Sequence, residues 1–198
     1  MPREGKAKVL SEAEFKRMLE MLTGELHGAR NTAMLYLSFG LGLRVKELAA
    51  LSIVDIIDVD GHIREEINLL RRMTKGGKQR HVYLTNDQVR AALQAYLNIR
   101  HQDRRHAVAP GSPLFLSNKG SRFSPNSLQQ VFKRLYKQAG IDGASSHSGR
   151  RTFATRLIEK GVDIKAVSRL MGHSTVAMTA EYVEDNPARL KNITREIL

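Results

Sequence analysis

The sequence predicts an α+β fold that is mainly α, with a small antiparallel sheet of three strands inserted between helices. Capping-box and proline signals mark helix starts along much of the chain. One stretch of β-branched alternation, which begins at Ile53 and contains a hairpin signal, interrupts this helical pattern. The 198 residues are 41% hydrophobic, which is enough for one domain with a core of its own.

The N-terminal part is predicted to be helical. Ser11 and Glu14 have the spacing of a capping box, which predicts a helix from there to about residue 22. Two further helices are expected, over about 30–39 and 45–51. The break Gly40-Leu41-Gly42 separates them.

The three strands are expected to follow these helices. Asp60-Gly61 is the strongest short hairpin signal in the chain, and Lys75-Gly76-Gly77-Lys78 supplies a second tight turn. The last strand is expected over 81–84. A second capping-box match, at 85–88, then predicts a helix that extends to about Arg100.

Short loops and helices are expected over the rest of the chain. Residues 114–116 are apolar and predict a short strand. Ser124 followed by Pro125 has the pattern of a helix cap with proline at the first helical position. Helices are therefore expected over about 126–139, 149–160, 163–171, 175–182 and 187–197. No repeat or interdomain linker interrupts them, so the sequence predicts a single domain.

The charge of the chain favours a polyanionic partner. Its 32 Lys and Arg against 20 Asp and Glu give a net charge of +12, which points to nucleic acid or an anionic membrane surface. The longest apolar stretch, 33–43, is shorter than the roughly 18 residues of a spanning helix, so we interpret it as a buried core helix. Zero cysteines exclude a disulfide framework, a thiolate zinc site and a cysteine nucleophile. With no apolar run behind the charged N-terminus, we expect a cytoplasmic protein without membrane contact.

A set of basic and phenolic residues stands at predicted element boundaries. They are Arg44, Lys75, His147, Arg150, His173 and Tyr182. Each has an ordinary structural interpretation, such as an ion pair of Arg44 with Glu47 or a helix cap at His173. Together they contain groups that bind phosphate, because arginine offers a planar fork to two oxygens and lysine a mobile charge or proton. The tyrosine adds a nucleophile.

The segments around these residues resemble the catalytic domain of the tyrosine recombinases, the phage integrase family. The matching segments, in the family's order, are GLRVKEL at 42–48, TKGGKQRHVYL at 74–84, SHSGRRTFATRL at 146–157 and LMGHSTVAMTAEYVE at 170–184. The resemblance begins at about Val9. We therefore expect a flexible N-terminal extension at 1–8 and a tyrosine recombinase catalytic domain at 9–198, without the N-terminal core-binding domain of most members.

The resemblance implies a role for each candidate at a scissile DNA phosphate. Arg44 and Arg150 would clamp the non-bridging oxygens, and His173 would hold another phosphate oxygen. His147 would lie beside the nucleophile as hydrogen-bond partner or proton acceptor. Tyr182 would attack phosphorus and form a 3′-phosphotyrosyl enzyme.

Two further roles complete the implied site. Lys75, carried on its hairpin, would protonate the departing 5′ oxygen, and Glu47 would orient a basic group of the site. Fixed cations would replace the charge stabilisation that Mg²⁺ gives other enzymes, and the acids of the chain have no metal-ligand spacing. The sequence therefore predicts neither a metal nor a cofactor.

The sequence departs from the family pattern at His147-Ser148-Gly149-Arg150-Arg151, where His-x-Leu-Arg-His is usual. Glycine replaces the aliphatic residue, and Arg151 replaces the second histidine and is a candidate DNA contact. A basic strip without acids at 71–80 supplies further candidates. They are Arg71, Arg72, Lys78 and Arg80, beside Lys75. A solvated hairpin is the alternative for all but Lys75.

The implied function is site-specific recombination, in which DNA strands are cleaved and rejoined during integration, excision or inversion. One alternative is a non-cutting DNA-binding accessory or regulatory protein of the same fold. Another is topoisomerase-like relaxation or hairpin telomere resolution by the same tyrosine chemistry. The implied partners are double-stranded DNA, further copies of the chain in a tetramer, and accessory DNA-bending proteins.

Two structural alternatives also stay open. The missing clamp domain fits a natural single-domain enzyme, an excised catalytic domain, or a clamp supplied by a partner. The predicted helix at 187–197 carries an apolar stripe that fits either a neighbouring subunit or its own domain.

Overall fold

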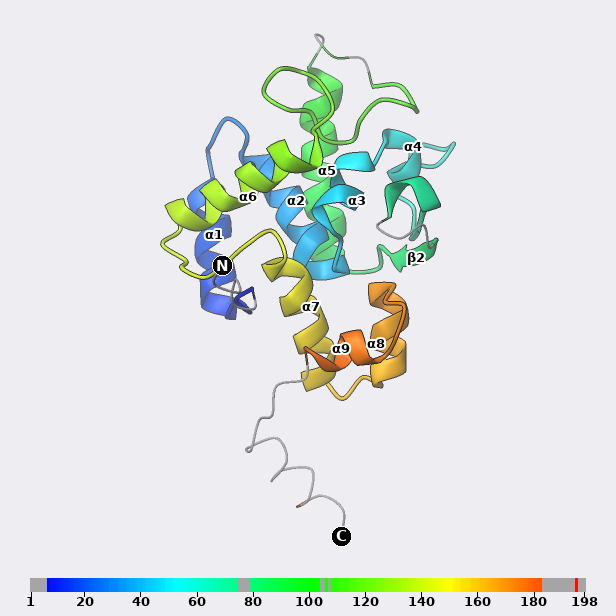
Figure 1. The fold of residues 1–198 in the computed structure, drawn as a ribbon. Helices are drawn as coiled ribbons and strands as arrows, with labels where there is room; N and C mark the ends of the chain where they lie inside the picture. The colour runs from blue at the N-terminus through cyan, green and yellow to red at the C-terminus, as the bar shows by residue number, and fades with distance from the viewer. Residues whose placement is uncertain (1–6, 75–78, 104–105, 107, 183–194, 196–198) are drawn as a thin grey trace.

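The computed structural model describes residues 7–74, 79–103, 106, 108–182 and 195, which form a mainly helical α+β fold (Figure 1). The predicted fold class is confirmed. The elements, in chain order, are α1 (Glu12–Leu22), α2 (Gly28–Leu41), α3 (Val45–Ala50), α4 (Ile53–Ile56), β1 (Glu66–Leu69), the 3₁₀ helix η1 (Arg71–Met73), β2 (Arg80–Tyr83), α5 (Asp87–Gln102), α6 (Pro125–Gln138), α7 (Ser148–Glu159), α8 (Ile164–Met171) and α9 (Ala177–Ala180).

The helix starts follow the predicted capping signals closely. The Ser11 hydroxyl accepts from the Glu14 amide at 3.2 Å, and the Glu14 carboxylate accepts from the Ser11 amide at 2.9 Å, so the first capping box is confirmed. Ser124 caps α6 ahead of Pro125, as predicted. At α5 the predicted cap is wrong by one residue, because the Asn86 side chain accepts from the Val89 amide.

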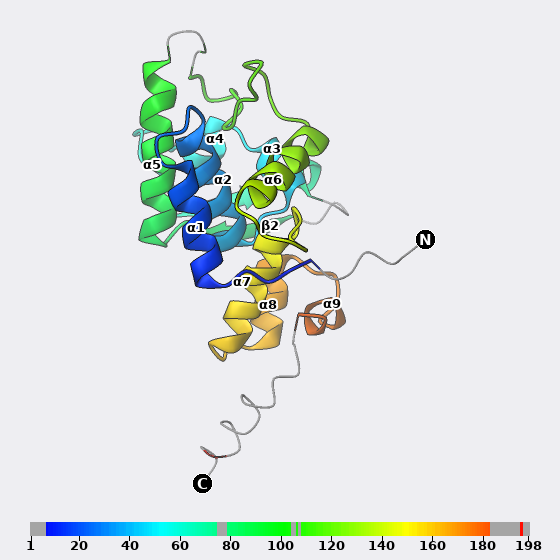
Figure 2. The ribbon, with the colours of Figure 1, turned by 90° about the vertical axis from the view of Figure 1, so that its left-hand side faces the viewer.

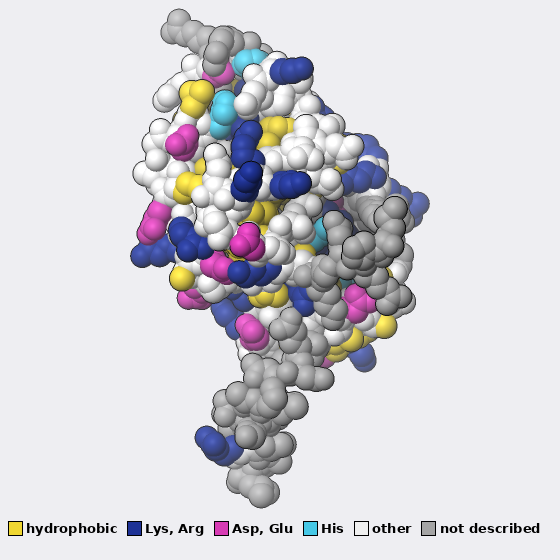
Figure 3. Space-filling view, turned by 60° about the vertical axis from the view of Figure 1, so that its left-hand side comes forward, with side chains coloured by type: hydrophobic (Ala, Val, Ile, Leu, Met, Phe, Trp, Pro, Cys, Tyr) yellow, Lys and Arg dark blue, Asp and Glu magenta, His cyan; other side chains and the backbone are white. Residues whose placement is uncertain are grey.

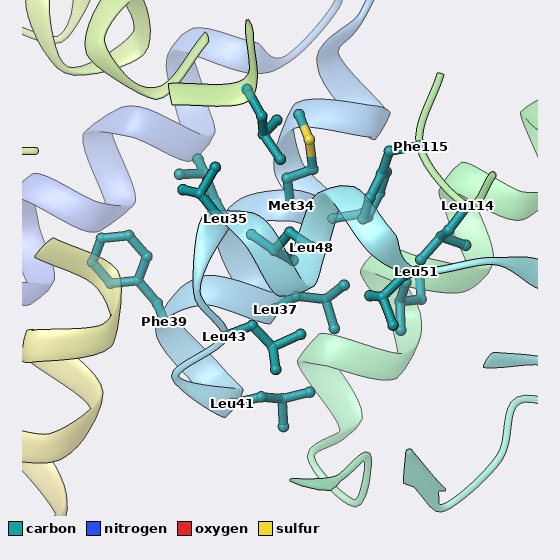
Figure 4. Packing of buried hydrophobic residues seen from close by; sticks show 14 of the residues in the cluster. Met34, Leu35, Leu37, Phe39, Leu41, Leu43, Leu48, Leu51, Leu114 and Phe115 are labelled. Atoms are coloured by element: carbon teal, nitrogen blue, oxygen red, sulfur yellow. The ribbon is translucent and has the colours of Figure 1, made fainter. Parts of the chain in front are cut away.

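Helix α2 is the centre of the fold. Met34, Leu35 and Leu37 are fully buried, and α2 packs against α1, α5 and α7. Figure 4 shows side chains of α2, of the α3 region and of residues 114–115 converging in this core. The interpretation of 33–43 as a buried core helix is confirmed. Among the described residues, none of the helices combines the length and apolar character needed to cross a bilayer.

A smaller unit lies at the other end of α7. Ala154 and Ile158 of α7 pack with Val167 and Met171 of α8 in a separate apolar cluster. Figures 1 and 2 both show α8 and α9 beside the lower part of α7, away from α5 and α6. Helix α7 therefore joins the main core to this unit, and the space between them is where the candidate residues converge.

The sheet is smaller than predicted. Within the described residues it has two antiparallel strands, β1 and β2, with Glu66 opposite Tyr83 and Leu69 opposite Arg80. The expected first strand is instead the short helix α4, followed by one bridge between Ile57 and Ile63.

A local cap explains this correction. The Asp55 carboxylate accepts from the Ser52 amide at 2.8 Å, which starts a helical turn and places the buried side chains of Ile53 and Ile56 on one face. The predicted strand at 114–116 is also wrong, because only Leu116 forms a bridge there, to Arg122. The second predicted turn, at 75–78, and the predicted helix at 187–197, apart from Arg195, lie outside the described residues.

Lys8, the last residue of the predicted extension at 1–8, contacts the rest of the chain. Lys8 donates its amide to the Gly143 carbonyl at 3.0 Å and its ammonium group to Glu14 at 2.6 Å. Leu10 then donates to the Thr152 hydroxyl of α7. Lys8 therefore packs against the domain, and residues 1–6 of the predicted extension lie outside the described residues.

Candidate active site

Several candidate residues come together beyond the C-terminal end of α2. Arg44 precedes α3, Arg150 lies in the first turn of α7, and His173 follows α8. Tyr182 lies shortly after α9. Arg150 interacts electrostatically with Arg44, His173 and Tyr182. The four side chains therefore lie in one cluster.

Glu47 organises two of the cations. Its carboxylate is fully buried and accepts from Arg44 twice, from the amide at 2.7 Å and from Nη1 at 3.0 Å. It also accepts from Nη2 of Arg80 at 2.8 Å. Burial, opposed by the attraction of Glu47, lowers the pKa of Arg80 below its ordinary value. One buried anion thus holds two guanidinium groups in fixed positions.

Arg150 is held by main-chain carbonyls instead. Its Nη1 donates to the Gly42 carbonyl at 2.7 Å and its Nη2 donates to the Met171 carbonyl. These acceptors stand at the C-terminal ends of α2 and α8, where the helix dipole favours a cation. Burial, followed by repulsion from Arg44 and Arg80, lowers the pKa of Arg150 to about 9, so the group remains charged at neutral pH.

Two glycines let the backbone come close enough to build this site. Gly172 ends α8 with a φ of +61°, and a Cβ there would lie 2.4 Å from Cδ of Arg80. In α7, a Cβ at Gly149 would lie 2.3 Å from the Ser38 hydroxyl and 2.9 Å from the Phe39 ring. The glycine that departs from the family pattern therefore lets α7 approach α2 closely.

His173 and Tyr182 form a stacked pair. Their ring centroids are 5.6 Å apart and the ring planes differ by 10°. Nδ1 of His173 lies 2.8 Å from the hydroxyl of Thr179, a fully buried residue of α9. Burial, followed by the nearby arginines, lowers the pKa of His173 to about 4, so the imidazole is neutral at neutral pH.

Three further predicted residues are His147, Lys75 and Lys78. His147 is exposed at the residue before α7, one turn ahead of Arg150. Lys75 and Lys78 lie outside the described residues. Thr74, which precedes Lys75, is buried, and its carbonyl accepts from Nζ of Lys46 in α3 at 3.3 Å. Thr74, the last described residue before Lys75, therefore lies next to α3.

The basic strip divides into an exposed part and a buried part. Arg71 and Arg72 are exposed on η1, as a contact strip requires. Arg80 is not on this surface, because residues of β2 alternate between buried and exposed and Arg80 faces inward with Val82. Arg151 is also buried, within α7. For these two residues the expected exposed position is corrected.

Sequence reasoning missed Arg80 and Thr179 as parts of the cluster. The signal for Arg80 was present, because period-2 alternation with Val82 and Leu84 puts all three on the inner face. Thr179 stands three residues before Tyr182, one helical turn away, but a threonine at that spacing is too common to select by sequence.

Within the described residues, one group of potential metal ligands has its ligand atoms within 4.8 Å of one another: Asp58, Asp60 and His62. The tight turn explains it, since Oδ1 of Asp58 accepts from the amides of Asp60 at 3.0 Å and His62 at 2.8 Å. The cluster around Arg150 contains the acid Glu47, and both carboxylate oxygens of Glu47 already accept from arginine. The arginine side chains of this cluster are hydrogen-bond donors, which suit an anion better than a metal ion.

Fold and site together define a mainly helical domain in which arginines, a histidine and a tyrosine from separate segments lie in one cluster. The chain belongs to the phage integrase family, because the model of that family matches residues 8–189. The resemblance found in its motifs is therefore confirmed.

Curated relatives carry the name tyrosine recombinase. The XerC protein of Pelobacter propionicus is 35% identical over 170 residues, which cover 85% of this chain and 52% of the relative. The XerD protein of Pseudomonas putida is 34% identical over 200 residues, which cover 98% of this chain and 63% of the relative. The chain thus spans roughly half to three fifths of the length of such relatives.

Solved structures share the fold. The crystal structure of XerA recombinase is similar with a TM-score of 0.77 and 30% identity, covering 99% of this chain and 67% of the other. The XerH site-specific recombinase, in a post-cleavage complex with a palindromic difH substrate, has a TM-score of 0.74 at 24% identity, covering 98% of this chain and 54% of the other. The second likeness establishes a common fold.

Proposed function

We propose that residues 9–198 form the catalytic domain of a site-specific DNA recombinase that cleaves and rejoins strands through a 3′-phosphotyrosyl intermediate. The observation that carries this proposal is the convergence of Arg44, Arg150, His173 and Tyr182 from four separate segments. Membership of the phage integrase family supports it, as does the name tyrosine recombinase of the curated relatives.

The two arginines suit a phosphate that gains charge in a pentavalent transition state. Arg44 is anchored by Glu47 and Arg150 by two carbonyls, so both are oriented before substrate arrives. Donors fixed in this way stabilise developing charge without reorganisation, and each typically contributes several kcal/mol. We further propose that the Thr179 hydroxyl donates to Nδ1 of His173, which leaves the proton of the neutral ring on Nε2 to be donated to a further phosphate oxygen.

Tyr182 would attack phosphorus, forming a bond from its phenolic oxygen while the bond to the 5′ oxygen breaks. The phenolic proton would pass to His147, and Lys75 would give a proton to the departing 5′ oxygen. The 5′-hydroxyl then reverses these steps on the same or another strand. The ester preserves the energy of the phosphodiester, so rejoining needs no nucleotide cofactor.

Double-stranded DNA is the partner that the surface supports. The net charge is +12, and Figure 3 shows lysine and arginine side chains spread over one face, with acidic ones between them. We propose Arg71, Arg72 and Lys78 as phosphate contacts, which would make affinity strongly salt-dependent. A homotetramer on DNA, DNA-bending partners and a cytoplasmic location complete the proposal.

Covalent trapping tests the proposed function. The chain would be incubated with a library of nicked duplexes, in which cleavage releases a short strand and the adduct cannot rejoin. We expect wild type and Tyr83→Phe, which alters an exposed tyrosine of β2, to form adducts and Tyr182→Phe to form none. Binding by wild type without any adduct would favour the non-cutting accessory protein instead.

A further inference from the structure

A second concave site lies at the opposite end of α2 from Arg44. It is a cavity of about 730 Å³ between the start of α2, the C-terminal half of α5 and the segment 116–120. Cavities of this size are typical of small-molecule sites. In Figure 1 these parts of α2 and α5 lie at the upper end of the molecule, whereas α8 and α9 lie at the lower end. The cavity is therefore separate from the candidate active site.

Arg100 makes this cavity unusual. The residue is 4% exposed and lines the cavity, yet Nε, Nη1 and Nη2 have no hydrogen-bond partner among the described residues. A buried guanidinium is costly unless it is paired, and natural cores rarely leave all its donors unsatisfied. The arrangement is expected where the missing acceptor is a ligand.

Arg30 adds a second donor to the same cavity. Its Nη1 donates to the Leu116 carbonyl at 2.8 Å and to Oδ1 of Asn118 at 3.1 Å, and its guanidinium lies 5.2 Å from the centre of the Phe123 ring. These contacts fix the group, whereas Nη2 is buried without a partner among the described residues. A fixed fork with an open donor is suited to an oxyanion.

The rest of the lining favours an anion with an apolar body. Among its described residues Asp103 is the single acid, and it already lies 3.1 Å from Nδ1 of His106. Apolar surface is supplied by Leu26, which is 92% exposed, and by Ile99, which is 53% exposed. The charged donors are thus buried, and apolar side chains stand at the rim.

We propose that this cavity binds a small organic anion, whose phosphate or carboxylate group accepts from Arg100 and from Nη2 of Arg30 while its apolar part contacts Leu26 and Ile99. Burial of Arg100 selects against a DNA duplex, because a backbone phosphate on a broad helix cannot descend to a guanidinium that is 4% exposed. The anion has the chemistry of a phosphate monoester or an aromatic carboxylate.

The test titrates the full chain with inorganic phosphate, phenyl phosphate and benzoate, using calorimetry and amide chemical shifts. We expect saturable binding of phenyl phosphate or benzoate, tighter than that of inorganic phosphate, with shifts at 27–30, 99–100 and 116–120. The tighter of the two aromatic probes identifies the head group. Shifts confined to residues around Arg150, or no saturable binding, would overturn the proposal.

Variants separate the pocket from general charge effects. Arg100→Met should weaken binding at least tenfold, whereas Arg17→Met, which removes an exposed charge of α1, should leave it unchanged. Arg100→Lys keeps the charge but loses the fork, and it should bind with intermediate affinity. Equal binding by wild type and both Arg100 variants would contradict the proposal. So would competition by a short duplex at the same resonances, which would make the cavity part of a DNA interface.

Discussion

The arginines near the two ends of α2 differ in whether the protein supplies their hydrogen-bond acceptors. Beyond its C-terminal end, Glu47 pairs with Arg44 and Arg80, and carbonyls of Gly42 and Met171 hold Arg150. Near its N-terminal end, Arg100 is equally buried, but among the described residues nothing accepts from it. The comparison teaches that burial of a cation alone does not identify a catalytic site. The partners show whether the protein has already oriented the group or leaves it for a ligand.

The two ends of α2 should also differ in how a substitution changes the free energy of unfolding. At the active-site end, the cations depend on a protein anion, so removing that anion leaves charges buried without compensation. At the cavity end, Arg100 donates no side-chain hydrogen bond to another described residue, so replacing Arg100 breaks no such bond. Substitutions at the two ends should therefore change stability in different directions.

The largest effect is expected from Glu47→Gln. Breaking a buried ion pair by removing one partner typically costs about 3 to 5 kcal/mol, because the remaining charge is uncompensated. We expect a loss of free energy of unfolding of about 3 kcal/mol in urea denaturation. Glu14→Gln is the matched control, since Glu14 pairs with Lys8 on the surface and should cost less than about 1 kcal/mol. Equal losses in the two variants would contradict the central role of Glu47.

A smaller loss is expected from Gly149→Ala. Its Cβ would lie 2.3 Å from the Ser38 hydroxyl, so α7 must move away from α2, and such overpacking costs roughly 1 to 3 kcal/mol. Gly111→Ala is the control, because a Cβ there meets nothing within 4 Å. The midpoint of thermal unfolding should fall for Gly149→Ala and stay unchanged for Gly111→Ala. An unchanged midpoint in Gly149→Ala would show that α7 and α2 can accommodate a methyl group between them.

Arg100→Met should change stability least among the charge substitutions. Replacing a buried charge by a side chain of similar length removes a desolvation cost, so we expect the free energy of unfolding to be unchanged or raised by about 1 kcal/mol in anion-free buffer. A loss comparable to that of Glu47→Gln would mean that Arg100 has a structural partner, and the contrast between the two ends would fail.

A further effect depends on pH. The pKa of His173 is lowered to about 4 in the folded chain, below its ordinary 6.5, so the unfolded chain binds the proton first as pH falls. His173 therefore stabilises the fold above pH 6.5, and this contribution is lost between pH 6.5 and pH 4. Urea midpoints of His173→Gln should fall less over that window than those of wild type. Parallel curves would show that His173 keeps its ordinary pKa.

Motifs predicted the active-site end better than the cavity end. Each of four candidate residues lies in a short sequence motif that can be recognised without a structure, and the fold brings them together: Arg44, Arg150, His173 and Tyr182. The Arg80–Glu47 pair spans 33 positions and depends on the inward face of β2, so its partner is visible only in three dimensions. The strand predicted from Ile53 failed because β-branched residues also fit a short capped helix.

The cavity end left no sequence signal. Arg30 and Arg100 lie within helices whose other residues have ordinary periodicity, and exposed arginines are common at such positions. The packing of α2 against α5 buries them, together with the segment 116–123 in the case of Arg30. Candidate residues that belong to a known motif can thus be found by sequence, whereas a candidate site that depends on burial alone cannot.

We propose that the cations beyond the C-terminal end of α2 are oriented to neutralise one DNA phosphate. This proposal is tested most directly by comparing adduct formation by wild type and Arg44→Ala on a target site, once with a normal scissile phosphate and once with an uncharged methylphosphonate there. We expect Arg44→Ala to slow adduct formation by about 100-fold or more on the phosphate but only slightly on the methylphosphonate. Equal losses on both substrates would show that Arg44 does not act on the phosphate charge and would contradict the proposed role of these cations.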